Sequence, residues 1–305
     1  MTKRRVWDLF HILLYSRLVQ SVEHRNLTPD VGGSNPSTAA KLKELFIMKY
    51  FITSDVHSYY TELMTALNKE GFDINNKDHI LCICGDLFDR GSEPIKLFEF
   101  VKNLNEQNRL IYIRGNHEDL LEQCVNEIRT SKHVGLCHFY NGTVETICRF
   151  CRENEWIVHD PSKKDFIYNT MKPILDFINK TSINYKEIGD YILVHGWVPL
   201  DTNAENFRNA SEDHWKSARW TNGMAAWRTP EYRVKNKTVI CGHYHCSWGW
   251  SFIRQERQEY PQKNRKDWLK SFEPFIDDGI MAIDACCHYS GKLNVIKLGD
   301  KNDYN

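Results

Sequence analysis

The sequence lacks an excess of charge of either sign, because 40 lysines and arginines balance 40 aspartates and glutamates. A protein that coats nucleic acid, or that binds membranes through a polybasic surface, needs a positive excess facing phosphate, so both classes are disfavoured. No uninterrupted apolar run reaches the roughly 18 residues that cross a bilayer. Internal repeats and linkers rich in glycine, serine or proline are also missing. We therefore expect no nucleic-acid partner and no membrane association.

What is present is a large apolar fraction. Hydrophobic residues make up 41% of the 305 positions, and aromatic residues make up 12%. This is enough for a sizeable core and too much for a disordered chain. With a typical domain of roughly 150 residues, the length alone suggests about two domains.

Ten cysteines are too few for a secreted disulfide framework in a chain of this length. Most stand in apolar stretches, such as Cys82 and Cys84 in HILCICGD, which predicts buried thiols that act as small apolar side chains. Cys148 and Cys151 form a C-x-x-C pair with a Cys-His pair at 137–138 upstream. A structural zinc site there is the alternative interpretation.

Residues 1–47 differ from the rest of the chain. They carry seven basic and four acidic residues, a net charge of +3, so the remainder carries −3. The opening KRRVWDLFHILLY imitates a signal peptide, but Asp8 and His11 interrupt its apolar part and no A-x-A site follows. We expect a cytoplasmic protein whose functional chain begins at Met48, with 1–47 a gene-start artefact or a disordered tail. An N-terminal helix docked on the domain is the alternative.

Seven short runs rich in β-branched residues end in polar residues. Near-continuous apolar character in such runs is typical of strands that are covered on both faces. The predicted strands are KYFITSD (49–55), HILCICGD (79–86), RLIYIRGN (109–116), YILVHGW (191–197), TVICGH (238–243), GIMAIDA (279–285) and KLNVIKL (292–298).

Helical patterns separate the first of these runs. Apolar residues recur at helical spacing over 59–70, 94–107 and 118–128, and the region 131–187 is predicted to be mostly helical. Residues 250–275 form a charged insertion before the last two strands. Strand and helix alternation predicts an α/β fold with parallel strand pairs. Binding groups are then expected at the carboxyl ends of strands.

Polar motifs stand at those strand ends. In chain order they are SDVHS (Asp55, His57), GDLFDRG (Asp86, Asp89, Arg90), RGNHE (Arg114, Asn116, His117), VHGW (His195) and GHYH (His243, His245). A single D-x-H or G-H-x-H is weak evidence, whereas GDxxDRG followed by RGNHE is highly specific. Carboxylate, amide and imidazole groups without a thiolate favour Mn²⁺, Mg²⁺, Zn²⁺ or iron.

The five motifs in this order resemble the calcineurin-like metallophosphoesterase superfamily, and within it the PPP-type serine/threonine phosphoprotein phosphatases, including small bacterial and phage members. The resemblance spans about residues 48–300. It implies a β-sandwich of two mixed sheets flanked by helices, with the metal site at the carboxyl ends of strands. Because ligands between 55 and 243 must converge on one site, 48–305 is expected to be one domain.

The resemblance also implies two divalent ions, with Mn²⁺ preferred and iron, Zn²⁺ or Mg²⁺ as alternatives. The first ion is expected on Asp55, His57 and Asp86. The second is expected on Asp86, Asn116, His195 and His243. A hydroxide between the ions would attack phosphorus in line. His117 resembles the acid that protonates the leaving group, and Asp89 resembles the carboxylate that orients the His117 ring.

Three further assignments follow from the resemblance. Arg90 and Arg114 are expected to bind phosphate oxygens with their forked donors. A third arginine of this kind is expected between the last two ligand histidines, either Arg219 or Arg228. His245 departs from the pattern of many PPP phosphatases. Three interpretations of His245 are open. It is either a ligand of the first ion, as in diesterase-type relatives, or a group outside the ligand shell, or a residue without a role in the site.

Six tryptophans stand among the late motifs, at 197, 215, 220, 227, 248 and 250. Either they pack in the core, or some line the cleft and stack on a substrate ring such as adenine.

Taken together, the motifs predict a metal-dependent phosphomonoesterase that acts on phosphoserine and phosphothreonine in proteins. The arginines favour this chemistry because a terminal phosphoryl dianion has more charge to neutralise than a diester. A nucleotide hydrolase, such as a symmetrical dinucleoside tetraphosphatase, or a phosphodiesterase is the alternative. A more remote alternative is a non-catalytic binding protein with the same fold. The expected partner is a phosphoprotein or a small phosphorylated or nucleotide substrate.

Overall fold

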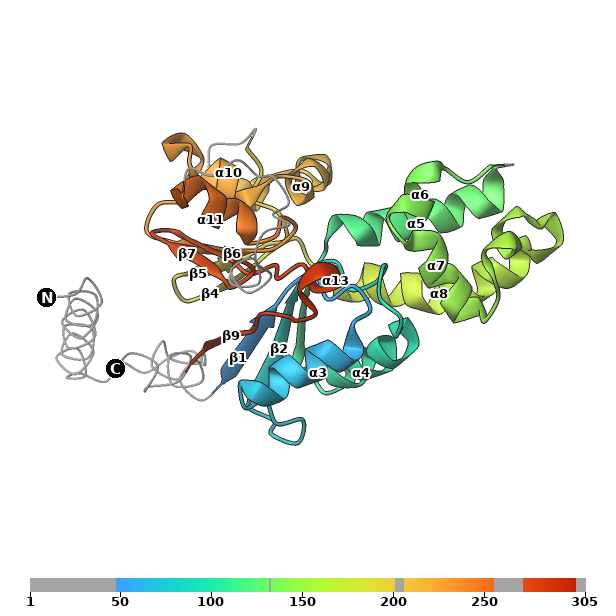
Figure 1. Cartoon of the computed structure of the whole chain (residues 1–305), viewed down its shortest axis with the longest axis horizontal. Coiled ribbons are helices and arrows are strands. Elements are labelled where there is room, and N and C mark those ends of the chain that lie inside the picture. Colours follow the sequence, from blue (N-terminus) through green and yellow to red (C-terminus); the bar gives the residue numbers. More distant parts are fainter. Residues whose placement is uncertain (1–47, 132, 201–205, 255–270, 300–305) are drawn as a thin grey trace, which may run out of the picture. The chain divides into compact units, whose positions relative to one another are not determined.

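The structure is a computed structural model that describes residues 48–131, 133–200, 206–254 and 271–299 (Figure 1). The predictions for 1–47, and most of the charged insertion at 250–275, lie outside the described residues. The chain divides into two compact units, 1–50 with 297–305 and 51–296. All candidate site residues belong to the second unit. The assignment of 48–305 to one domain stays a prediction.

The first sheet contains the strands that precede three of the motifs. Its order is β3-β2-β1-β9, formed by β1 (Lys49–Thr53), β2 (His79–Cys84), β3 (Leu110–Ile113) and β9 (Ile296–Leu298). β2 and β3 are parallel, with Leu81 opposite Leu110. All six residues of β2 are buried, as expected for a strand covered on both faces.

The second sheet is mixed, with the order β4-β5-β6-β8-β7. Its strands are β4 (Lys186–Ile188), β5 (Tyr191–Leu193), β6 (Thr238–Cys241), β7 (Phe275–Asp277) and β8 (Ile280–Ala282). The three central strands are parallel, and the edge strands β4 and β7 pair antiparallel with β5 and β8. Parallel central strands bring their carboxyl ends to one edge of the sheet.

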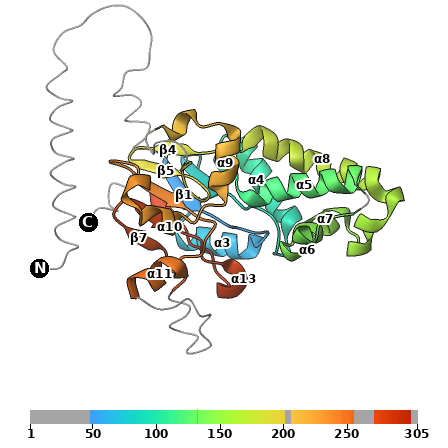
Figure 2. The same ribbon diagram turned by 90° about the horizontal axis from the view of Figure 1, so that it is seen from above.

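Helices pack on both sheets. Those that precede β4 are α3 (Tyr60–Lys69), α4 (Pro94–Glu106), α5 (Asn116–Thr130), α6 (Leu136–Tyr140), α7 (Thr143–Cys151) and α8 (Lys164–Thr181). Those that follow are α9 (Glu212–Arg219), α10 (Gly223–Trp227), α11 (Ser247–Arg254) and α13 (Cys287–Ser290). Helices α5 to α8 pack on one another, whereas α10 and α11 pack on the second sheet (Figures 1 and 2). Short 3₁₀ turns span Glu155–His159, Pro161–Lys163, Phe207–Asn209 and Pro230–Tyr232.

This architecture confirms the predicted fold class. Each of the seven predicted strands and each of the three predicted helices is present, and 131–187 is mostly helical. Two apolar clusters form the core. One gathers side chains of β1 to β3 and α3 to α8, and the other gathers side chains of β5, β6, β8 and α9 to α11.

The cysteines are free thiols, and nearly all of them are buried. Burial raises the pKa of Cys148 and of Cys151 to about 11, which keeps both thiols protonated. Within the described ranges no cysteine belongs to a group of side chains able to hold a metal ion, which argues against the zinc alternative. In the same ranges we find no helix whose length and apolar character would let it span a membrane.

Candidate metal centre

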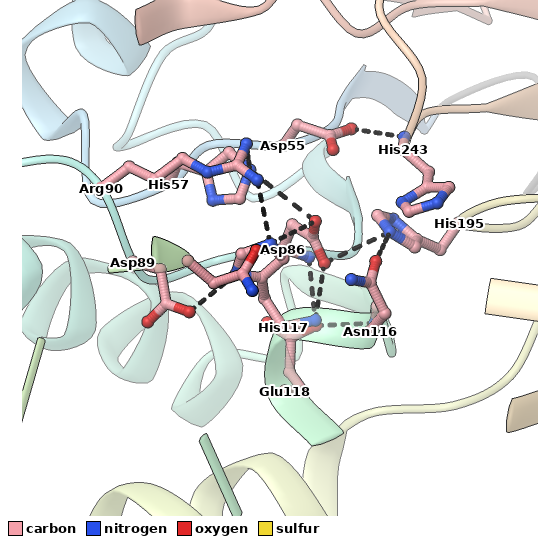
Figure 3. A network of polar contacts seen from close by, with 12 residues as sticks. Asp55, His57, Asp86, Asp89, Arg90, Asn116, His117, Glu118, His195 and His243 are labelled. Carbon is pink, nitrogen blue, oxygen red and sulfur yellow. Dashed lines mark hydrogen bonds and ion pairs between the residues drawn. The ribbon is translucent and has the colours of Figure 1, made fainter. Parts of the chain in front are cut away.

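The site forms where loops leave the carboxyl ends of the strands (Figure 3). Asp55 and His57 follow β1, and Asp86 follows β2. Asn116 begins α5 directly after β3. The two late histidines follow strands of the second sheet, His195 after β5 and His243 after β6. Residues from both sheets therefore converge, as the strand-end pattern predicts.

The loops that carry these residues have an uncommon backbone. Of the eleven non-glycine residues with positive φ in the described chain, six are candidate site residues: Asp55, His57, Asp86, Asp89, Arg90 and His243. A left-handed conformation costs a residue with a Cβ about 1–3 kcal/mol, and such residues gather at functional sites. The loops are thus held in conformations that aim these side chains inward.

Two glycines of the motifs allow the close approach of the site side chains. Gly85 has φ +82°, and a Cβ there would lie 2.4 Å from His195 Nδ1. A Cβ on Gly115 would lie 2.2 Å from Asp86 Oδ1. Both distances are far inside van der Waals contact, so these positions of the GD and RGN motifs require glycine.

The ring orientation of three histidines is fixed by backbone carbonyls. His57 Nδ1 lies 2.8 Å from the carbonyl oxygen of Phe88, and His195 Nδ1 lies 2.8 Å from that of Cys84. The His243 ring bonds the carbonyl of Trp220. In each neutral ring the N–H therefore donates to a backbone carbonyl, and the lone pair of the other nitrogen can bind a metal ion. This is how metal-binding histidines are usually oriented.

The lone pairs converge on Asp86. Its Oδ1 lies 3.2 Å from His195 Nε2, and its Oδ2 lies 3.7 Å from His57 Nε2. Asn116 Oδ1 lies 2.8 Å from the same His195 nitrogen. Acceptors that face one another without a proton between them repel, and a cation removes that repulsion. The donor set thus fits a divalent metal ion.

Ligand atoms within 4.8 Å of one another form two overlapping groups. One consists of His57, Asp86 and His117, and the other of Asp86, His195 and His243. Asp86 belongs to both, as expected for a carboxylate that bridges two ions. By geometry alone His117 is also a possible ligand.

Asp55 lies beside His243. Its Oδ2 accepts the backbone N–H of His243 at 2.9 Å, so it joins the loop after β1 to the loop after β6. The pKa of Asp55 is raised to about 6, chiefly by burial, which outweighs the lowering effect of His195 and is reinforced by nearby Asp86. Burial likewise raises the pKa of Asp86 to about 7. Buried negative charge of this kind is stabilised by a cation.

His117 is held by a carboxylate on the side away from Asp86. His117 Nδ1 lies 2.6 Å from Asp89 Oδ2. Asp89 is fully buried, and it accepts hydrogen bonds of 2.9 Å from Thr143 and Thr146 of α7. Burial lowers the pKa of His117, but Asp86 and Asp89 together outweigh that effect, so its pKa lies above the usual value.

Arg90 is exposed and reaches over the site. Its Nη1 lies 2.9 Å from His57 Nε2, and its Nη2 lies 3.1 Å from His117 Nε2. A guanidinium only donates, so both ring nitrogens accept in this arrangement. Arg90 is thus the one predicted phosphate-binding arginine whose guanidinium touches the site residues.

The other predicted arginines point elsewhere. Arg114 Nε and Arg219 Nη1 each lie 2.7 Å from an oxygen of Asp119. The remaining donors of Arg114 go to Glu122 and Asn179, and Nη2 of Arg219 goes to Glu212 and Asn184. Arg228, the alternative to Arg219, lies over the Phe252 ring at 4.4 Å.

His245 is half-buried, and its Nδ1 contacts the hydroxyl of Ser247. Its ring lies 5.7 Å from that of Phe272. Burial lowers its pKa to about 4, so the ring is neutral. It belongs to neither ligand group, and its role as a ligand stays a prediction.

Two buried acids were given no role from the sequence. Glu118 accepts the backbone N–H groups of Asp86, Leu87 and Gly115 at 3.0, 2.8 and 2.6 Å, so it joins the loop after β2 to the start of α5. The sequence signal for this role was the position of Glu118 in the first turn of a helix, where a glutamate side chain often accepts the backbone N–H of the residue that caps the helix. Burial and nearby Asp55 raise the pKa of Asp284 to about 8. Asp284 follows β8 in the same strand-end pattern as Asp55 and Asp86.

Comparisons with known proteins identify the family. The family model for calcineurin-like phosphoesterases matches residues 48–247. A symmetrical bis(5'-nucleosyl)-tetraphosphatase from Buchnera aphidicola subsp. Baizongia pistaciae is 34% identical over 83% of this chain and 95% of its own length. An asymmetrical bis(5'-nucleosyl)-tetraphosphatase from Bacillus subtilis is 36% identical over 50% of this chain and 59% of its own length.

Among solved structures, a Saccharomyces cerevisiae protein serine/threonine phosphatase with similarity to human PP5 aligns over 85% of this chain and 78% of its own. The TM-score is 0.46 and the identity is 17%. The family match covers well over half of the chain and contains all five motifs. The chain therefore belongs to the calcineurin-like phosphoesterase family, and it is a hydrolase of phosphoric esters.

Proposed function

We propose that the protein is a two-metal phosphohydrolase whose substrates are nucleotides with a polyphosphate chain, such as a dinucleoside tetraphosphate. The observation that carries the chemistry is the convergence of imidazole nitrogens from His57, His195 and His243 on Asp86, with the Asn116 amide oxygen beside the His195 nitrogen. Two divalent cations held there would supply Lewis acidity towards phosphoryl oxygens and a nucleophile drawn from water.

The residues of the chain would divide the remaining work. Asp89, held by two threonine hydroxyls, fixes the His117 ring so that Nε2 faces the centre. From there His117 would protonate the leaving oxygen. Arg90 now donates to His117 Nε2, so it would have to turn away before that nitrogen carries the acid proton. A phosphoryl group that attracts the Arg90 guanidinium would bring about this release.

Two observations support a nucleotide as the substrate. The relative from Buchnera aphidicola, named for dinucleoside tetraphosphate hydrolysis, is 34% identical over 95% of its length. The sequence argument for a phosphomonoester rested on several arginines around a terminal dianion. Arg114 and Arg219 are instead paired with carboxylates, which weakens that argument.

A protein phosphoserine or phosphothreonine phosphatase remains the second candidate. Exposed Arg90 beside the candidate ligands could still address a terminal phosphoryl dianion, and phosphomonoester hydrolysis needs no group that the nucleotide reaction does not also use. Mn²⁺ as the native metal and a cytoplasmic location both stay predictions.

The experiment is a substrate panel for the full chain loaded with Mn²⁺. The panel contains diadenosine tetraphosphate, p-nitrophenyl phosphate, bis(p-nitrophenyl) phosphate and a set of phosphoserine and phosphothreonine peptides. We expect the highest kcat/KM for diadenosine tetraphosphate and loss of activity on chelation. A higher kcat/KM for the phosphopeptides would establish the second candidate. A strong preference for the bis ester would refute both.

A further inference from the structure

The six tryptophans among the late motifs, all of them described, occupy different environments. Trp197 and Trp215 are 1% and 3% exposed and belong to the core of the second sheet. Trp227 and Trp250 are half-buried, and their indole N–H groups bond backbone carbonyls at 2.7 and 3.0 Å. Trp248 packs edge to face on Tyr244. Trp220 is 51% exposed.

Trp220 also stands at the metal centre. Its ring centroid lies 5.8 Å from that of His243, with an angle of 87° between the rings. His243 belongs to one of the two groups that could hold an ion. The indole is therefore separated from the expected position of a substrate phosphate by little more than one imidazole ring.

The backbone of Trp220 is fixed although its side chain is exposed. Trp220 ends α9, its N–H donates to Ser217 at 3.1 Å, and its carbonyl accepts from the His243 ring. The preceding Arg219 is 2% exposed and anchored by Asp119. An Ala substitution would keep the backbone bond to His243, so it would remove the indole without freeing the ligand.

An exposed indole on a fixed backbone beside a phosphate site favours one chemistry. A nucleotide places a flat aromatic base a short distance from its phosphates, and stacking on an aromatic side chain tolerates any base. Phosphoserine and phosphothreonine carry no ring at that distance. We propose that Trp220 is the base-stacking residue of the site and selects substrates whose phosphate carries a nucleoside. The proposal for Trp220 rests on the proposed function, and it identifies the residue that determines substrate specificity.

The test compares ligands with and without a base on the Mn²⁺-loaded full chain. Calorimetry measures ADP and orthophosphate, and kinetics measure diadenosine tetraphosphate and glycerol 2-phosphate. We expect Trp220→Ala to weaken ADP binding on the order of tenfold to hundredfold, because a stacked base contributes about 1–3 kcal/mol. The loss should recur as a higher KM for diadenosine tetraphosphate, with orthophosphate affinity, glycerol 2-phosphate turnover and metal content unchanged.

Trp220→Phe should restore most of the ADP affinity, since it keeps an aromatic face. Trp156→Ala is the matched control: Trp156 is 74% exposed, in the 3₁₀ turn Glu155–His159, and contacts no candidate site residue described here. It should change nothing. Equal losses for ADP and orthophosphate, or no loss for ADP, would overturn the proposal. If the wild type hydrolyses no ester of the panel, the proposed function fails, and ADP binding still decides the role of Trp220.

Discussion

Two networks of charged groups start from the first turns of α5, and they are built differently. In the network around Asp119, each oxygen of the central carboxylate accepts from one arginine. Both Nη atoms of Arg114 and Nη2 of Arg219 reach other acceptors of the chain, while the buried Arg219 Nε has no hydrogen-bond partner among the described residues. In the network around Asp86, the carboxylate oxygens face the lone pairs of His57 and His195, and Asn116 Oδ1 faces the same His195 nitrogen. Exposed Arg90 is the donor that reaches His57 there.

The difference separates groups that stabilise the fold from groups that await a ligand. A network whose opposite charges pair needs no ligand, and breaking it leaves buried charge unpaired. A network whose acceptors converge is incomplete without a cation. The same residue types thus serve two purposes within a few residues of α5, and each prediction below probes one side of this contrast.

The largest effect is expected for Asp86→Asn. The substitution removes the charge that both ligand groups share, so both ions should bind far more weakly. The loss of affinity should exceed the about 10–100-fold that removing an outer partner of a metal ligand costs. Hydrolysis should fall to background. Metal content per chain, measured by elemental analysis after gel filtration, checks this. Two ions retained at full occupancy would contradict the bridging role.

His117→Asn should act on turnover without removing metal. Loss of acid catalysis is expected to lower kcat by about 10²–10⁴-fold. Metal content should stay close to that of the wild type because the expected ligands remain. Asp89→Asn should give part of the same loss, since the ring keeps its place but loses the charge that favours its protonated form. If His117→Asn loses an ion, His117 is a ligand, as its proximity to His57 and Asp86 allows.

Arg219→Gln should chiefly affect stability. Charged hydrogen bonds to Asp119 and Glu212 are lost, which should lower the free energy of unfolding by about 2–3 kcal/mol. The KM for glycerol 2-phosphate should change little. Arg90→Gln is the matched variant and should do the reverse, because Arg90 is exposed and contacts the site. A higher KM in Arg219→Gln with unchanged thermal unfolding would restore Arg219 as a phosphate ligand.

The last prediction concerns pH and needs no substitution. Asp55 and Asp86 have pKa values of about 6 and about 7, above the usual 3.8, chiefly because they are buried. Below these values protons compete with the cation for the same oxygens. Affinity for Mn²⁺ should therefore rise between pH 5 and pH 8, by up to about tenfold per pH unit for each proton displaced, and level off above. Calorimetry across this range measures it, and a constant affinity would contradict the competition.

Much of the fold follows from local pattern. The apolar runs and the polar residues that end them predicted seven strands and the edge where the site lies, because buried parallel strands have a strong signature. β4 and β7 were not predicted. Each lies at a sheet edge and buries only one of its three residues, so neither gives the near-continuous apolar run that marked the predicted strands.

The site was predicted as far as the motifs specify position along the chain. From the motifs we expected Asp86, Asn116, His195 and His243 to lie close together. The direction of a long side chain, however, depends on partners that are distant in sequence. Arg219 pairs with Asp119, 100 residues away, and no local pattern predicts that pairing. The sequence alone does not distinguish Trp220 from the five other late tryptophans, because what sets it apart is the exposure of its side chain. Glu118 and Thr146 also fix the site. Each hydrogen-bonds a residue of the loop after β2 that is distant in sequence, Leu87 for Glu118 and Asp89 for Thr146.

The opening turn of α5 has a consequence for local unfolding. Asn116, His117 and Glu118 are consecutive, and they serve as candidate ligand, candidate acid and clamp on the Asp86 loop. A shift of this helix by one residue would rotate all three side chains by about 100° and disengage them together. The site should therefore assemble and come apart as a unit. Amide hydrogen exchange at Asp86, Leu87 and Gly115, the three groups that Glu118 holds, would report that event directly.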